Sequence, residues 1–199
     1  MTATKTRTRL ARAGIVAVAA AVVTVCGAGA ASAADKPLTW KGGFPIIGDQ
    51  QVKTVVHVDI PAKATPGQPV SVPFTLDVDT GDGVGDGLRL VGGKKIGGSI
   101  DAAVAIKVSD GKSISLKVNL PIPDTQVPPS GPIKFTSQGK VDFTVPQGTP
   151  TGKATISVDP KAVTHVTTDV SDPSLAKFDV NLALDPPDQD AVLGSTDVG

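Results

Sequence analysis

The sequence predicts an all-β protein, an antiparallel two-layer immunoglobulin-like Greek-key sandwich of eight or nine strands. Three observations favour this class. Apolar and polar residues alternate with a period of two in successive runs, the pattern of strands with one buried face. All 19 acidic residues are aspartate, a poor helix former, and glutamate is absent. Valine, threonine, glycine and proline are abundant, as expected of strands joined by turns.

Residues 52–60 and 70–78 each predict a half-buried strand. Their apolar positions, at alternate residues, are Val52, Val56, Val58, Ile60, Val70, Val72, Phe74, Leu76 and Val78. The residues between them are mostly polar, so we expect one face of each strand to meet water.

A β-hairpin over residues 100–122 is the clearest local prediction. Its inward positions are Ile100, Ala102, Val104, Ile106 and Val108, then Ile114, Leu116, Val118, Leu120 and Ile122. The link Ser109-Asp110-Gly111-Lys112 has the turn chemistry that joins two alternating runs.

The rest of the chain predicts shorter strands after a proline-rich connection over 121–132. We expect them at 133–135, 141–145, 154–158, 163–170 and 178–184, with a turn at 137–139 between the first two. No helix is expected after residue 34. The five phenylalanines stand singly among these runs, and we interpret them as core filling.

The N-terminus has the pattern of a secretory signal peptide over residues 1–34. Four basic residues precede an uncharged, alanine-rich run, which ends in the small residues 31–34. We expect cleavage after Ala33 or Ala34 by the general secretory route. An uncleaved membrane anchor is the alternative, and lipidation of Cys26 is disfavoured because Val25 precedes it.

The predicted domains are the signal peptide, a β-sandwich over 35–184 and a disordered acidic tail over 185–199. A division of the sandwich into two small subdomains that meet near 123–132 is an alternative, because Ile60-Pro61 and Val145-Pro146 introduce similar stretches. Residues 35–199 carry 15 basic and 19 acidic residues, a formal charge of −4. No basic stripe occurs, so we expect no nucleic-acid partner and, after cleavage, no stable membrane insertion.

The stretch DVDTGDGVGDG, from Asp77 to Gly87, raises the question of a calcium site. It departs from an EF-hand loop, with Gly81 at the fifth position and Leu88 at the twelfth. We interpret it as a solvated loop whose aspartates and glycines permit tight turns. An irregular calcium site formed by Asp79, Asp82 and Asp86 is the alternative.

No other residues carry a recognisable site. His57 and His165 are the only histidines and lie far apart in the sequence, so a zinc or copper site is not expected. Trp40 is interpreted as core packing, with a sugar-stacking contact as the alternative. No G-x-S-x-G motif is present. The sequence therefore predicts no catalytic, cofactor-binding or metal-binding residues, and no cofactor.

Two stretches carry a resemblance to a known group of proteins. They are Gly43-Phe44-Pro45-Ile46-Ile47-Gly48, and Asp59-Ile60-Pro61 followed by Pro66-Gly67-Gln68-Pro69-Val70. With the alanine-rich export signal, the chain resembles small secreted β-sandwich proteins of high-GC Gram-positive bacteria that contain a domain of unknown function. This resemblance implies a fold and an extracellular or cell-envelope location.

We therefore expect a secreted, non-catalytic β-sandwich module that acts by surface recognition or as an envelope or matrix component. Its partner would belong to the cell envelope or the extracellular space. The alternative is a secreted hydrolase that uses paired aspartates.

Overall fold

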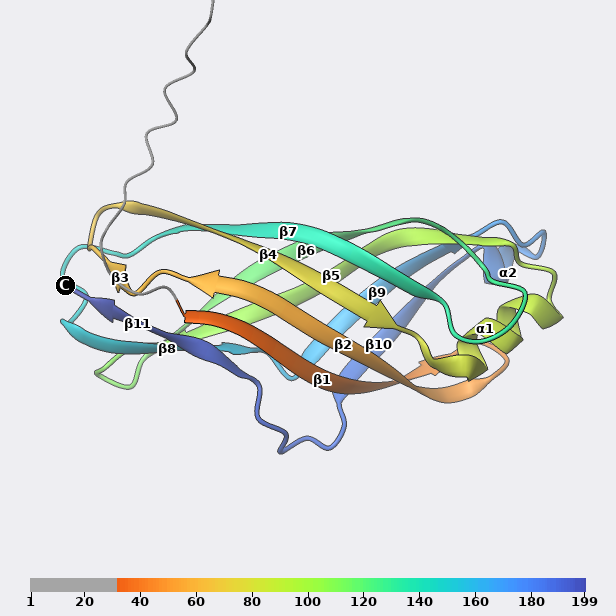
Figure 1. Ribbon diagram of the computed structural model, residues 1–199, viewed down its shortest axis with the longest axis horizontal. Helices are drawn as coiled ribbons and strands as arrows, with labels where there is room; N and C mark the ends of the chain where they lie inside the picture. The colour runs from red at the N-terminus through yellow and green to blue at the C-terminus, as the bar shows by residue number, and fades with distance from the viewer. Residues whose placement is uncertain (1–31) are drawn as a thin grey trace, which may run out of the picture.

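The computed structural model describes residues 32–199, which form one mixed, unclosed sheet of eleven strands with two helices (Figure 1). The predicted signal peptide lies outside the described residues up to position 31, and Ser32 begins the first strand. The elements are β1 Ser32–Phe44, β2 Gly48–Ile60, β3 Lys63–Ala64, β4 Pro69–Asp79, α1 Gly81–Leu90, β5 Lys95–Lys107, β6 Ser113–Gln126, β7 Lys134–Thr144, β8 Gly152–Val158, β9 Lys161–Thr168, α2 Pro173–Ala176, β10 Lys177–Leu184 and β11 Val192–Val198.

The strand order is β3-β11-β8-β5-β9-β10-β1-β2-β4-β7, and β6 pairs with the other edge of β5. The first half of β5 pairs with β9 and its second half with β8, so this strand is the branch point of the sheet. All pairs are antiparallel except β3 with β11. The β-rich class is confirmed, whereas the immunoglobulin-like Greek-key arrangement is not. Strands from both sides of residues 123–132 belong to the same sheet.

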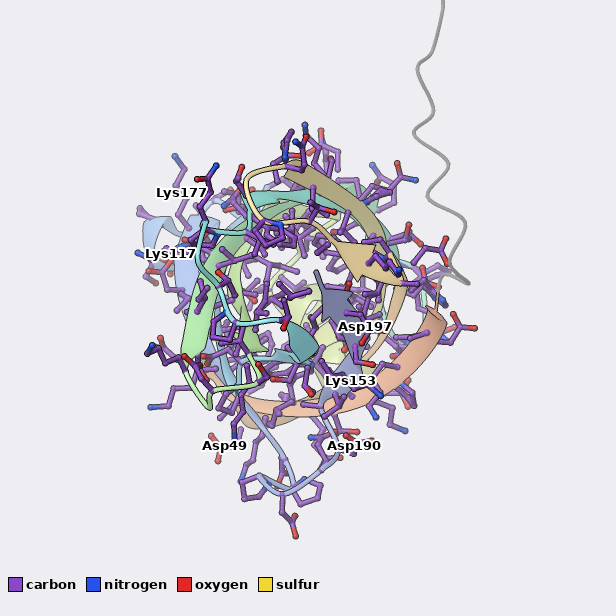
Figure 2. The ribbon with its side chains drawn as sticks, turned by 90° about the vertical axis from the view of Figure 1, so that its left-hand side faces the viewer. Asp49, Lys117, Lys153, Lys177, Asp190 and Asp197 are labelled. Atoms are coloured by element: carbon purple, nitrogen blue, oxygen red, sulfur yellow. The ribbon has the colours of Figure 1, made fainter. Side chains whose placement is uncertain are left out.

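The sheet curls until β6 and β7 lie against each other, and side chains from its strands point into the interior that the strands surround (Figure 2). Within residues 32–199 these two strands share no backbone ladder. Instead, the Ser137 hydroxyl donates a hydrogen bond to the carbonyl oxygen of Pro121, at 2.6 Å. A Cβ at Gly139 would lie 2.5 Å from a methyl carbon of Leu120. The turn predicted at 137–139 is wrong, because these small residues let two strands approach closely.

The alternating runs fold as predicted and supply the core. All nine apolar positions of the first two runs are buried or half-buried on one face of β2 and β4. The predicted hairpin joins β5 and β6, and the Val108 amide donates to the Lys112 carbonyl oxygen at 2.9 Å. Most phenylalanines are half-buried against this core, as predicted.

The predicted disordered tail is a second correction. Residues 192–198 form β11, which pairs antiparallel with β8 and in parallel with β3. Leu193 and Val198 are buried in the core. The apolar positions of this short, Gly-containing strand are few, and its pairing partners come from distant parts of the sequence. The polar composition of residues 185–199 therefore did not indicate this strand.

Helix α1 is a third correction, because seven of its ten residues, Gly81–Gly87, lie in the stretch predicted to be a loop. Glycines stand at positions 81, 83, 85 and 87, and glycine costs about 1 kcal/mol relative to alanine in a helix interior. Val84 and Leu88, one turn apart, are buried with Ile96 and Ile133 in a small second core. Tertiary packing of this face outweighs the poor helix propensity.

Candidate functional site

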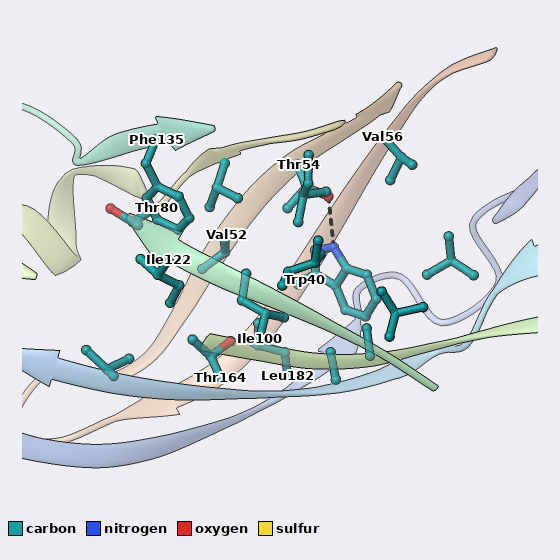
Figure 3. Close-up of a pocket in the computed structure, with 18 of the residues that line it drawn as sticks. Trp40, Val52, Thr54, Val56, Thr80, Ile100, Ile122, Phe135, Thr164 and Leu182 are labelled. Carbon is teal, nitrogen blue, oxygen red and sulfur yellow. Dashed lines mark hydrogen bonds between the residues drawn. The ribbon is translucent and has the colours of Figure 1, made fainter. Parts of the chain in front are cut away.

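The inward-facing side chains do not fill the space that the sheet encloses. A cavity of about 180 Å³ runs through the interior, and its walls are almost entirely apolar (Figure 3). Lining side chains come from opposite parts of the curled sheet, among them Val56 of β2, Ile100 of β5 and Leu182 of β10. An apolar cavity of about 150 Å³ can stay dry and bind benzene. The cavity in this protein is therefore large enough to hold a portion of an organic ligand.

Few polar groups reach the lining of this cavity. Trp40 is only 6% exposed, and its Nε1 donates a hydrogen bond to Thr54 Oγ1 at 3.0 Å, drawn as the dashed line in Figure 3. Thr80 Oγ1 accepts the Ile133 amide at 3.2 Å. Thr164 Oγ1 is buried and has no hydrogen-bond partner among residues 32–199. The prediction that Trp40 packs in the core is confirmed.

Helix α1 and the turn between β1 and β2 close one end of the cavity. Val84 and Leu88 of α1 line it, as do Phe44 and Ile47 from the two ends of the turn. A Cβ at Gly87 would lie 2.7 Å from a methyl carbon of Ile47, so glycine is needed for this approach.

A few polar contacts fasten α1 to the sheet and to the loop before β7. Asp79 Oδ1 accepts the Gly81 amide at 3.0 Å at the start of the helix. Arg89 donates to the carbonyl oxygens of Pro128 and Gly131, at 2.9 and 3.1 Å, and to Asp86 at 2.6 Å. Arg89 is the one arginine of residues 32–199, and it links the end of α1 to that loop.

The structure separates the three aspartates of the alternative calcium site. Asp79 pairs with Lys134 at 2.9 Å, Asp86 pairs with Arg89, and Asp82 lies in the first turn of α1. Within residues 32–199 no three histidine, cysteine or acidic side chains are grouped as metal ligands. Asp79 and Asp86 serve as ion-pair partners, Asp79 also accepts the Gly81 amide, and the calcium alternative gains no support.

The two histidines form a feature that the sequence analysis missed. His57 lies on the outer face of β2, with Nδ1 2.7 Å from Asp35 of β1 and Nε2 3.0 Å from Asp77 of β4. Thr136 of β7 then donates to Asp77 at 2.6 Å. Four neighbouring strands are connected by this row, which we call the His57 row.

An equivalent row, the His165 row, crosses the other half of the sheet. His165 of β9 lies 2.7 Å from Asp179 of β10 through Nδ1, and 3.2 Å from Asp101 of β5 through Nε2. Asn119 of β6 donates to Asp101 at 2.6 Å. In both rows the histidine faces one aspartate in register and a second one diagonally. In the sequence, most of these histidines and aspartates stand at outward positions of predicted strands. Only the pairing of the strands, which the structure shows, brings them together.

Protonation of each histidine is favoured by its two carboxylates. Hydrogen bonds to Asp35 and then to Asp77 raise the pKa of His57, and bonds to Asp179 and then to Asp101 raise that of His165. Hydrogen bonds from Thr136 and then His57 lower the pKa of Asp77. The pKa of Asp101 is lowered in the same way, by Asn119 and then His165.

These shifts predict that the protein is more stable at pH 5.5 than at pH 8.5. A histidine whose pKa is raised in the folded state stabilises that state. Its contribution is fully present at pH values below its ordinary pKa, about 6.5, and it is lost as the pH rises through the pKa of the folded state. The lowered pKa values of Asp77 and Asp101 add a stabilisation that is lost only in stronger acid. Urea unfolding at the two pH values measures the difference.

The double variant His57→Gln, His165→Gln should reduce this pH dependence, because it removes both titrating rings. Since both rows are exposed, 0.5 M salt should weaken the dependence in the wild type. An undiminished pH dependence in the double variant would show that other groups cause it.

Neither helix of the described residues has the length and hydropathy needed to cross a bilayer. Comparison with known proteins adds one match. A family model described as a family of unknown function, DUF6801, matches residues 39–194. No curated protein and no solved structure matches the chain.

Proposed function

Since the chain belongs to the DUF6801 family, whose function is unknown, we propose a function from the cavity itself. The protein is a secreted, non-catalytic module that holds an apolar ligand in its interior. It delivers or retains that ligand outside the cell or at the cell envelope. Support for export comes from the predicted signal peptide and from the resemblance to secreted proteins of high-GC Gram-positive bacteria.

The observation that carries this proposal is the apolar, incompletely filled interior. Protein cores normally pack to the density of organic crystals. Here several inward side chains on β4, β5 and β7 are only partly buried although they line the cavity, among them Leu76, Val104 and Phe143. A ligand that covered these side chains would gain the free energy of burying apolar surface, about 25 cal/mol per Å². Few polar groups would have to lose water in exchange.

The alternative, a hydrolase with paired aspartates, would need a carboxyl group with a raised pKa beside a cleft. Every aspartate of residues 32–199 with a shifted pKa has it lowered, as for Asp110 and Asp142. Aspartates are absent from the cavity lining. No observation favours the hydrolase over the binding module.

Titration with a long-chain fatty acid such as palmitate tests the proposal, with the emission of Trp40 as the readout. Trp40 is the single tryptophan of the chain and lines the cavity, so bound ligand should change its emission in a saturable way. Ala102→Phe should weaken binding at least about tenfold, because Ala102 lines the cavity and a phenyl ring would fill part of it.

Ala105→Phe is the matched control for this experiment. Ala105 lies on the same strand, β5, but at a position outside the cavity lining. This variant should bind palmitate as the wild type does. Equal binding by the two variants, or no saturable change of emission in the wild type, would refute the cavity as a ligand site.

A further inference from the structure

The shape of the cavity narrows the class of ligand. Five successive alternate residues of β2 line it, from Val52 to Ile60. At the rise of an extended strand these positions span about 27 Å. A volume of about 180 Å³ spread over that length describes a narrow channel. One unbranched alkyl chain fits such a space better than a fused ring system does.

The two ends of this channel differ in how they are closed. At the end near β3, β8 and β11, the core residues Ile60, Ala64 and Ala154 are 1–2% exposed. At the α1 end, Ile46 lines the cavity and is nevertheless 65% exposed. A residue that contacts both the cavity and the solvent marks a mouth. The mouth therefore lies at the turn between β1 and β2.

Helix α1 carries a second exposed apolar side chain near the turn. Leu90 is 83% exposed and stands three residues after Gly87, the residue that packs on Ile47. The turn itself is tight, since the Ile47 amide donates to the Pro45 carbonyl oxygen at 2.7 Å and Ile46 has a φ of 60°. Ile46 is thereby held outward beside the helix, where an alkyl chain leaving water would first meet it.

We propose that the cavity takes the tail of a single-chain amphiphile, which enters between α1 and the β1–β2 turn, with α1 acting as a lid. This inference rests on the proposed function. The polar head stays in solvent at the mouth, because burying it among apolar walls would be costly. Four glycines make α1 a weak helix, and it is held mainly by the Arg89 and Thr80 contacts and by the small core around Ile133.

A disulfide between α1 and the turn tests the lid directly. A Cβ built at Gly87 lies 3.8 Å from the Cβ of Ile47, which matches the usual separation in disulfides. The variant is Ile47→Cys, Gly87→Cys in a full chain that also carries Cys26→Ser, so that no other thiol is present. Failure of the two thiols to oxidise would contradict the close packing of α1 on the turn.

Uptake of palmitate is followed by stopped-flow emission of Trp40 in the oxidised and the reduced protein. The oxidised form should take up palmitate at least tenfold more slowly, and reduction should restore the faster rate. The single variants Ile47→Cys and Gly87→Cys, each with Cys26→Ser, should show no such response to oxidation. Equal rates in the oxidised and reduced double variant would overturn the lid and indicate passage elsewhere, such as between β6 and β7.

Two further results separate this inference from the proposed function. If palmitate does not bind to the wild type, both the proposed function and the lid are overturned. Palmitate that binds, with a rate unaffected by the disulfide, overturns only the lid. Cholesterol, a compact fused-ring lipid, should bind at least tenfold more weakly than palmitate, and equal affinity would contradict the single-chain class.

Discussion

Gly98→Ala is expected to lower the melting temperature by about 10 °C, from a loss of roughly 3 kcal/mol or more in the free energy of unfolding. Gly98 has a φ of 130°, a conformation that residues with a side chain rarely adopt. A Cβ there would lie 1.9 Å from the carbonyl oxygen of His165. That oxygen belongs to the backbone of β9, so it cannot rotate away as a side chain would.

The position of Gly98 explains why the clash would spread through the sheet. It lies in β5, beside a register shift in the ladder with β6, and it also pairs with Val166 of β9. β5 holds three other strands, so a displaced β5 disturbs several ladders together. Gly43→Ala is the control, because a Cβ at Gly43 would meet nothing closer than 3.6 Å. A similar melting temperature for both variants would contradict this description of β5.

Ile133→Ala should cost about 2–5 kcal/mol, the usual range for truncating a large buried aliphatic side chain. Ile133 is 0% exposed and packs with Val84, Leu88 and Ile96 under α1. Its backbone also exchanges hydrogen bonds with Thr80, and these should survive the substitution. We therefore expect α1 to lose its packing before the rest of the sheet does.

Urea unfolding measures this cost, and hydrogen exchange of the α1 amides shows whether the helix opens first. Ile133→Val should cost only about 0.5–1.5 kcal/mol, because it removes a single methyl group. Ile114→Ala is the control at a residue that is 37% exposed, where we expect less than about 1 kcal/mol. Equal costs at positions 133 and 114 would contradict the buried second core.

The sequence predicted the strands whose period of two is long and regular. The runs in β2, β4, β5 and β6 have one wet face, and alternation identifies such strands without knowledge of their neighbours. It could not predict the pairing. Whether strands close as two sheets or as one depends on contacts between distant segments, such as Ser137 with Pro121.

The errors share a physical cause. Helix α1, strand β11 and the uninterrupted course of β7 through Gly139 all depend on tertiary packing that overrides local propensity. Glycine serves close approach at Gly87 and Gly139, whereas sequence reasoning assigned both to loops or turns. The cavity could not be predicted either. The apolar pattern of a strand's inward face is the same whether or not the side chains of the facing strands fill the interior.

The central claim is that the interior of the curled sheet holds an alkyl chain, and intermolecular nuclear Overhauser effects test it most directly. With uniformly ¹³C-labelled palmitate, we expect contacts from the chain methylenes to the methyl groups of Val56, Ile100 and Leu182, which line the cavity. Contacts confined to exposed side chains such as Ile114 and Val192, or no contacts at saturating palmitate, would contradict the claim.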